Sequence, residues 1–254
     1  MLNFLKKLDT NFFNSFIYKT KQRVIKWIKL KNITDLPKNI DKDFNLFERF
    51  NFFKCAAYYL QTNRINGVYC EFGCHTASTF RMALRTLGLP FKPNKINRFY
   101  AFDSFEGMPD AKGIDKQTIW KEGINTTQIE KFKKLIKKDL YRTKIVKGFY
   151  NDSLKNYNLL DGDKVAMAYL DCDYYSSTVD CLKFLDNKYL HGSILVFDDW
   201  NCYYSDPQRG QRLAFEEYRK EQINKYEFVE FFQIKTGGMS FIVLEKNKVG
   251  KEVL

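Results

Sequence analysis

The fold is decided by two neighbouring segments, VAMAYLDCDYYSST (residues 165–178) and SILVFDDW (residues 193–200). Each begins with a short apolar run that contains β-branched or aromatic residues and is too short for a helix, which is typical of a buried parallel strand. The residues between them have a helical pattern. The two segments therefore predict a strand–helix–strand unit of an open α/β sheet.

Carboxylates follow both predicted strands. Asp171 follows the first strand, and Asp198 and Asp199 follow the second. Ligands of open α/β sheets bind beyond the carboxyl ends of the strands, so we expect these three side chains to converge. Clustered carboxylates repel one another, and a divalent ion with oxygen ligands, such as Mg²⁺, removes the repulsion. The alternative interpretation, which suffices for a single aspartate, is that these residues only cap helices.

The ends of two earlier predicted strands carry the features of a cofactor site. Gly73 allows close backbone approach, and the helix N-terminus that follows favours an anionic group. Glu71 would repel a phosphate and suits an ammonium group, whereas Asp103 is placed to accept hydrogen bonds from a ribose. S-adenosylmethionine combines an amino group, a carboxylate and a ribose without phosphate. A helix cap explains Asp103 and Ser104 about as well when they are taken alone.

The remaining pattern predicts one α/β domain after an N-terminal extension. Helices are predicted at residues 1–40, 44–62, 78–87, 178–190 and 212–222 and from residue 127, and strands at 67–73, 98–102, 144–147, 164–170, 193–197, 227–234 and 239–244. The last two strands form a hairpin that turns at Gly237 and Gly238. In the second helix, apolar residues recur at helical spacing and are expected in the core; they are Phe47, Phe50, Phe53, Ala57 and Leu60.

Composition limits the class of protein. A chain of 254 residues with 44% hydrophobic residues can bury a substantial core. It has neither the apolar span of a transmembrane helix nor the apolar region of a signal peptide, so we expect a cytoplasmic protein. The six cysteines show no C-x-x-C spacing, which argues against a zinc site or a disulfide framework.

The net charge of +12 accompanies abundant Lys, Asn, Ile, Phe and Tyr, as an A+T-rich coding sequence would produce. Because no nucleic-acid-binding motif is present, we expect no nucleic-acid partner.

Residues 1–30 alternate apolar and basic side chains. A basic amphipathic segment can lie on an anionic membrane. We favour packing against the core or a second copy of the chain, because the segment has more apolar residues than a solvated tail would carry. The extension is thus expected to be a lid or a dimer element of a homo-oligomer, and peripheral membrane contact is not favoured.

Five segments resemble the macrocin O-methyltransferase family of S-adenosylmethionine-dependent, metal-dependent sugar O-methyltransferases and, more distantly, catechol O-methyltransferase. They are GVYCEFG (67–73), FDSFEGMP (102–109), KGFYNDSL (147–154), LDCDYYSST (170–178) and GSILVFDDW (192–200). The resemblance covers about residues 50–244. It implies a Rossmann-like class I fold with a mostly parallel seven-stranded sheet, helices on both faces and a C-terminal antiparallel hairpin. The implied domains are a helical extension, residues 1–45, and a methyltransferase domain, residues 46–254.

The resemblance also implies roles for individual residues. It places Glu71, Gly73, His75 and Thr79 around the methionine moiety, Asp103 at the ribose with Ser104 beside it, and Asp171, Asp198 and Asp199 on Mg²⁺. Asp171 is the first candidate for the base, ahead of Asp173 and His75. The sequence departs from the family pattern at four positions: His75 replaces an aromatic or basic residue, Ala77 a glycine, Thr79 a serine and Trp200 a tyrosine.

These features predict methyl transfer from S-adenosylmethionine to a hydroxyl of a sugar or sugar nucleotide, with a divalent metal lowering the pKa of that hydroxyl. The alternative is a metal-dependent glycosyltransferase, whose Asp-x-Asp motif also binds a cation and a nucleotide sugar. Glu71 and the lack of a nucleotide-binding loop after the first strand argue against it. A noncatalytic nucleic-acid-binding domain is the third hypothesis and rests on net charge alone.

Overall fold

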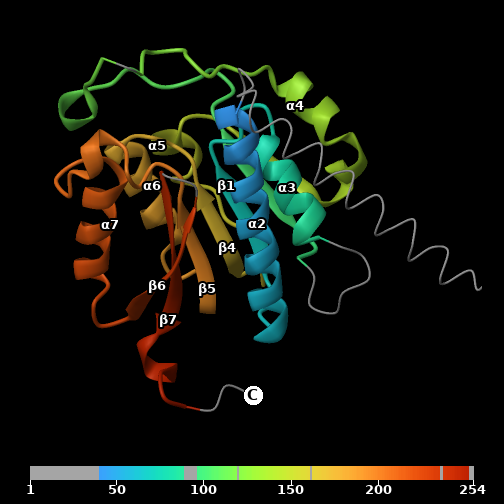
Figure 1. The fold of residues 1–254 in the computed structure, drawn as a ribbon, viewed down its shortest axis with the longest axis vertical. Helices are drawn as coiled ribbons and strands as arrows, with labels where there is room; N and C mark the ends of the chain where they lie inside the picture. The colour runs from blue at the N-terminus through green and yellow to red at the C-terminus, as the bar shows by residue number, and fades with distance from the viewer. Residues whose placement is uncertain (1–39, 89–95, 119, 161, 235–236, 252–254) are drawn as a thin grey trace, which may run out of the picture. The chain divides into compact units, whose positions relative to one another are not determined.

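One seven-stranded sheet in the order β3-β2-β1-β4-β5-β7-β6 forms the centre of the protein (Figure 1). The strands are β1 Val68–Phe72, β2 Phe99–Asp103, β3 Thr143–Lys147, β4 Val165–Leu170, β5 Tyr189–Phe197, β6 Tyr226–Ile234 and β7 Gly238–Glu245. The helices are α2 Ile40–Thr62, α3 Ser78–Thr86, α4 Ile129–Leu135, α5 Tyr150–Ser153, α6 Tyr175–Leu185 and α7 Gly210–Glu221. The first five strands pair in parallel, and β7 pairs antiparallel with both β5 and β6. The predicted class I topology is confirmed.

The computed structural model describes residues 40–88, 96–118, 120–160, 162–234 and 237–251. Residues 1–39 of the N-terminal helix predicted over 1–40 lie outside the described residues, and so do the predictions of a lid, a dimer element or a membrane contact. From Phe47 onward the chain forms one compact unit. Among the described helices, none has the length and apolar character needed to cross a lipid bilayer.

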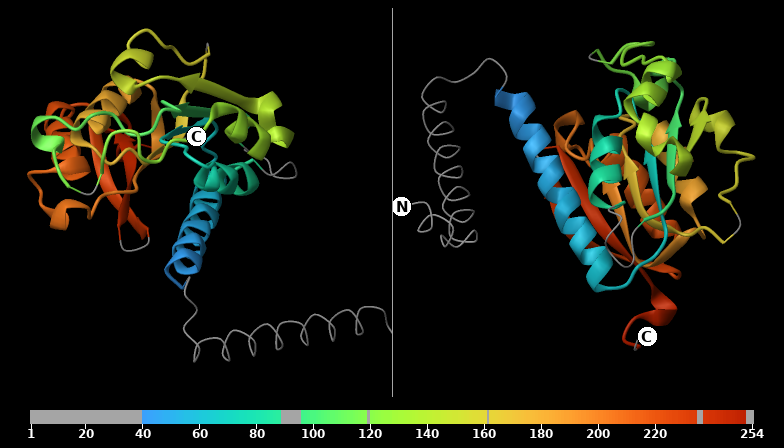
Figure 2. Two further views of the ribbon diagram at one scale, coloured as in Figure 1. Left: turned by 90° about the horizontal axis from the view of Figure 1, so that it is seen from above. Right: turned by 90° about the vertical axis from the view of Figure 1, so that its right-hand side faces the viewer.

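Successive side chains along the strands point to opposite faces of the sheet and pack into two separate cores, one on each face. Tyr69 and Tyr169 belong to the core under α2, α3 and α4, whereas Cys70 and Leu170 belong to the core under α6 and α7. Figure 2 shows α2, in blue, on one side of the sheet, with α6 on the other. Because both faces are covered, the central strands β1 and β4 are buried along their length, and β4 is a continuous apolar run. Each fully buried large side chain contributes roughly 1.5–3 kcal/mol to folding.

Helix α6 begins three residues earlier than its predicted start at Thr178. The carboxylate of Asp115, which is 4% exposed, accepts hydrogen bonds from the backbone N–H groups of Tyr175 (2.7 Å) and Ser176 (3.2 Å). These are first-turn donors that have no partner within the helix. The predicted end at residue 190 was also wrong, because the chain has already entered β5 at Tyr189.

The face of α2 that meets the sheet is offset from the predicted one. Phe53 and Leu60 are buried as predicted, but Phe47 and Phe50 are 55% and 41% exposed. The buried face instead runs along positions 52, 53, 56 and 60, and Arg49, whose side chain is 18% exposed, lies on the same side of the helix. This offset brings a charged residue, Arg49, onto the side of α2 that faces the sheet.

Candidate functional site

A cavity of about 710 Å³ lies beyond the carboxyl ends of the parallel strands. Its walls come from α6 and from the loops after β1, β2, β3 and β4. The loop after β2, which leads to α4, runs across the top of Figure 1 in green. The residues that line it and matter below are Arg49, Gly73, His75, Asp103, Ser104, Asp115, Asp171 and Asp173. A ligand crevice at this edge is what the topology of an open α/β sheet predicts.

Gly73 joins the first loop to the end of β4. It has a φ of +89°, and a Cβ at this position would lie 1.8 Å from the carbonyl oxygen of Asp171. No side chain fits there. Two residues further on, His75 also has a positive φ, of 39°, and Ala77, which stands where the resembled family has glycine, keeps a left-handed backbone at φ 58°. The loop therefore has a glycine-like shape at Ala77.

Asp103 organises two loops at once. Its Oδ2 accepts hydrogen bonds from the backbone N–H groups of Cys74 (2.7 Å) and His75 (2.9 Å), and its Oδ1 accepts one from Phe105 (2.7 Å). A carboxylate has about four lone-pair sites, so at least one remains for a ligand in the cavity. Ser104 shapes the turn that follows by donating to the carbonyl of Gly107 (2.8 Å).

Two of the predicted cofactor residues do not line the cavity. Glu71 is 0% exposed, and its Oε2 accepts a hydrogen bond from the hydroxyl of Tyr69. Its Oε1 is buried without a hydrogen-bond partner, and burial raises the pKa of Glu71 well above its usual range. Thr79 is buried in the first turn of α3. The predicted contacts of Glu71 and Thr79 with the cofactor stay predictions, whereas Gly73, His75, Asp103 and Ser104 do line the cavity.

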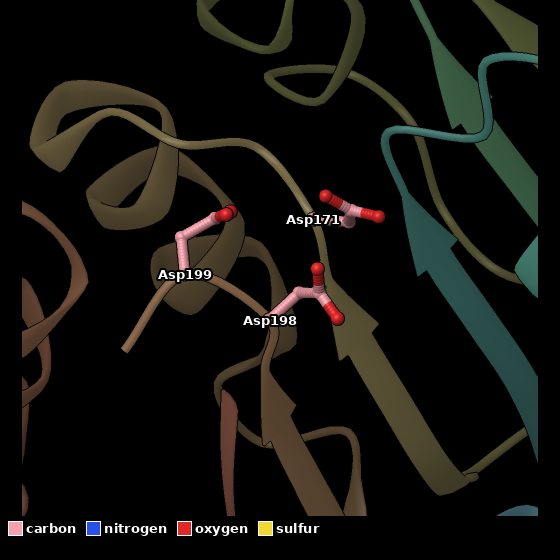
Figure 3. Close-up of side chains that lie close together, drawn as sticks. All are labelled: Asp171, Asp198 and Asp199. Atoms are coloured by element: carbon pink, nitrogen blue, oxygen red, sulfur yellow. The ribbon is translucent and has the colours of Figure 1, made fainter. Parts of the chain in front are cut away.

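Asp171, Asp198 and Asp199 converge at the ends of β4 and β5 (Figure 3). One carboxylate oxygen of each lies within 4.8 Å of those of the other two. Oxygen atoms on opposite sides of an octahedral Mg²⁺ are about 4.2 Å apart, so small side-chain rotations would bring this set to a divalent ion. The donor set consists of hard oxygen atoms only and fits Mg²⁺, Mn²⁺ or Ca²⁺.

Neighbouring groups hold two of these carboxylates in place. Asp198 is 2% exposed, and its Oδ1 accepts a hydrogen bond from the hydroxyl of Tyr169. Asp199 accepts a hydrogen bond at Oδ2 from the backbone N–H of Asp173 (3.1 Å), and its own N–H donates to the side chain of Gln211 (2.9 Å). The amide of Gln211, which is 1% exposed, donates to the carbonyl of Leu170 at the end of β4 (3.2 Å). These bonds tie the two strand ends together.

Sequence reasoning missed one residue of the cluster, Arg49. Its guanidinium donates a hydrogen bond from Nη2 to Oδ2 of Asp198, and the same nitrogen lies 3.9 Å from Oδ2 of Asp171. Burial lowers the pKa of Arg49, but the electrostatic effects of Tyr169, Asp198 and Asp171 outweigh it and raise the pKa above its usual value. The only sequence signal is the position of Arg49 four residues before Phe53, on the face of α2 that packs against the sheet.

Two solved methyltransferase structures are similar to this chain. The solved structure of the O-methyltransferase NovP has 20% sequence identity and a TM-score of 0.60, and the alignment covers 78% of this chain and 80% of that one. The structure of CalS11, a calicheamicin methyltransferase, has 20% identity and a TM-score of 0.60, with 89% of this chain and 91% of that one covered. These likenesses show a shared fold. The search of curated proteins finds no match.

The strand order, the antiparallel hairpin and the cavity at the carboxyl ends of the strands define the class I methyltransferase fold. A family model described as Macrocin-O-methyltransferase (TylF) matches residues 32–230. The chain belongs to this family and is an O-methyltransferase, which confirms the family resemblance and the predicted reaction type.

Proposed function

We propose that the protein transfers the methyl group of S-adenosylmethionine to a hydroxyl of a sugar or sugar nucleotide, and that it does so with a divalent metal. The observation that carries the proposal is the position of Asp171, which both lines the cavity and belongs to the carboxylate cluster. A group bound in the cavity can therefore meet the cluster directly. CalS11 supports the substrate class, because one of its structures is described as a TDP-rhamnose 3′-O-methyltransferase.

The cofactor end of the cavity is assigned to the loops after β1 and β2. Asp103 lines the cavity with its carboxylate fixed by three backbone N–H groups, so a ribose hydroxyl would meet an acceptor whose orientation is already set. Gly73 has no side chain, so the methionine end of the cofactor could approach the backbone closely there. His75 and Ser104 complete this wall. Bound here, S-adenosylmethionine supplies the methyl group as a sulfonium.

The acceptor end is assigned to the ends of β4 and β5. Asp171, Asp198 and Asp199 would hold the divalent ion, and an ion bound by them supplies a Lewis acid that lowers the pKa of the acceptor hydroxyl. Asp171 is the proposed base, because it is the member of the cluster that lines the cavity. Its carboxylate would orient the hydroxyl and accept its proton as the methyl group is transferred.

Aromatic residues from three segments pack together beside the cavity, next in the chain to its lining residue Asp173. Trp120, from the segment between β2 and α4, packs edge to face with Tyr174 and with Tyr203, at ring-centroid distances of 6.0 and 5.3 Å. Arg209 lies over the ring of Tyr203 at 4.7 Å and donates to the carbonyl groups of Ile114 (3.3 Å) and Lys116 (3.2 Å). We assign the acceptor's specificity to this junction, where the three segments meet. A cytoplasmic location, a homo-oligomeric state and the division at residue 45 remain part of the proposal.

The alternative, a metal-dependent glycosyltransferase, is not favoured, because the family match and the sheet topology both belong to methyltransferases. Calorimetric titration of the purified full-length protein separates the two. We expect S-adenosylhomocysteine to bind and nucleotide diphosphates without a sugar not to compete with it. Binding of nucleotide diphosphates together with a failure to bind S-adenosylhomocysteine would contradict the proposal. A panel of sugars and sugar nucleotides, incubated with methyl-labelled S-adenosylmethionine, then identifies the acceptor.

A further inference from the structure

Helix α2 is fixed above the ends of β4 and β5 by an aromatic contact. The ring of Phe53 stacks on the ring of Tyr169 at a centroid distance of 5.7 Å and an interplanar angle of 15°. Both rings are fully buried. Arg49 lies one helical turn before Phe53 and therefore on the same side of α2. The backbone that carries the guanidinium is thus held by the core.

The guanidinium of Arg49 covers the carboxylate of Asp198 from the side of the cavity. Arg49 is among the residues that line the cavity, whereas Asp198 is not and is only 2% exposed. Oδ1 of Asp198 accepts a hydrogen bond from Tyr169, and Oδ2 accepts one from Arg49. Both oxygen atoms of this carboxylate therefore already have a donor, and the donor on the cavity side carries a positive charge.

The contact of Arg49 with the carboxylates uses only one of the guanidinium nitrogen atoms. Only Nη2 contacts the two carboxylates, at Asp198 and, more distantly, at Asp171, and Nε of Arg49 is buried without a hydrogen-bond partner. An arginine that serves mainly to lock a carboxylate usually forms two parallel hydrogen bonds with it. The arrangement fits a guanidinium that supplies positive charge beside three carboxylates and can give up part of its place to a divalent ion.

We propose that the guanidinium of Arg49 offsets part of the negative charge of the aspartate cluster in the metal-free protein and competes there with a divalent ion. The proposal rests on the metal site of the proposed function. A cation at the cluster meets the positive charge of Arg49 at a few ångströms, in surroundings where such repulsion is only partly screened. Arg49 therefore stabilises the metal-free fold and keeps metal binding weaker than three carboxylates alone would make it.

The test compares the binding of Mn²⁺ alone to metal-free wild-type protein and to Arg49→Gln, by isothermal calorimetry. We expect Arg49→Gln to bind Mn²⁺ about tenfold more tightly or better, because one repelling charge is gone. In EDTA it should unfold at a lower temperature than wild type, and saturating Mn²⁺ should raise its melting temperature by more than it raises that of wild type. Arg49→Lys keeps the charge and should stay near the wild-type affinity, which provides a second variant if Arg49→Gln folds poorly.

Arg98→Gln is the matched control. Arg98 also pairs with an aspartate, Asp163, at 2.5 Å, but outside the cavity and the cluster. Its loss should lower the melting temperature and leave Mn²⁺ affinity unchanged. Equal or weaker Mn²⁺ binding by Arg49→Gln, with wild type binding normally, would overturn the competition and leave the metal site standing. Absence of binding to both proteins would overturn the competition and the metal site together, while binding of S-adenosylhomocysteine tests the methyltransferase assignment separately.

Discussion

Arg49 and Asp198 form an ion pair that joins helix α2 to the carboxyl end of strand β5. The two residues are 149 positions apart in the sequence. The pair places the only arginine among the cavity-lining residues of the described chain directly beside the cluster of three aspartates. The cluster is therefore connected to helix α2 through Arg49 as well as to the strands that supply its members.

Replacing Asp103 with Ala should weaken the binding of S-adenosylhomocysteine by about 1–3 kcal/mol, since it removes the proposed acceptor of the ribose hydrogen bonds. It also frees the N–H groups of Cys74 and His75, which the carboxylate now holds. Titration calorimetry measures the effect. Asp163→Ala, which removes an aspartate that pairs with Arg98 outside the cavity, is the control and should leave the dissociation constant unchanged. An unchanged constant in Asp103→Ala would rule out this ribose assignment.

Gly73→Ala should destabilise the fold by at least about 2 kcal/mol, because strain at a left-handed backbone adds to a clash in a packed site. The new methyl group would meet the carbonyl oxygen of Asp171. Gly113→Ala is the matched control: Gly113 also has a positive φ, of 54°, but a Cβ there meets no atom within 4 Å. It should cost only about 1 kcal/mol. Urea denaturation measures both, and equal losses would show that the contact between Gly73 and Asp171 has no special role.

Glu71 should make the stability of the protein depend on pH. Burial raises its pKa above the ordinary value of 4.5, so between pH 4.5 and the folded-state pKa the folded protein binds more protons at this site than the unfolded chain. The contribution of Glu71 to stability is complete below pH 4.5 and is lost as the pH rises towards the folded-state pKa. In Glu71→Gln this loss cannot occur. Melting temperatures of both proteins between pH 5 and pH 8 should diverge as pH rises, and parallel curves would contradict the assignment.

Most of the sheet could be predicted from the sequence because its central strands are buried on both faces. Apolar runs such as residues 165–170, followed directly by aspartate, mark both the strand and its functional end. The convergence of the three aspartates followed from the same pattern, since parallel strands place their carboxyl ends at one edge. The start of α6 could not be predicted, because its first donors are satisfied by Asp115, which lies 60 residues away in the chain.

One residue of the site escaped prediction, and the direction of a second side chain could not be predicted. A charged residue in an amphipathic helix normally faces solvent, so the pattern of α2 gave no sign that Arg49 meets Asp198. Glu71 could be placed at the end of β1, but a strand pattern that is buried on both faces does not say which face a given side chain meets. The structure directs Glu71 towards Tyr69, two residues earlier on the same face, and away from the walls of the cavity.

The metal requirement of methyl transfer tests the central claim most directly. With a sugar or sugar nucleotide from the panel as acceptor, transfer from S-adenosylmethionine should stop in EDTA and return with Mg²⁺, and S-adenosylhomocysteine should bind in both conditions. Asp198→Asn keeps the size of a metal ligand and removes its charge, so its turnover should fall by at least about 100-fold while the fold persists. Full methyl transfer in EDTA, by protein shown to contain no metal, would contradict the claim that Asp171, Asp198 and Asp199 hold the ion on which the reaction depends.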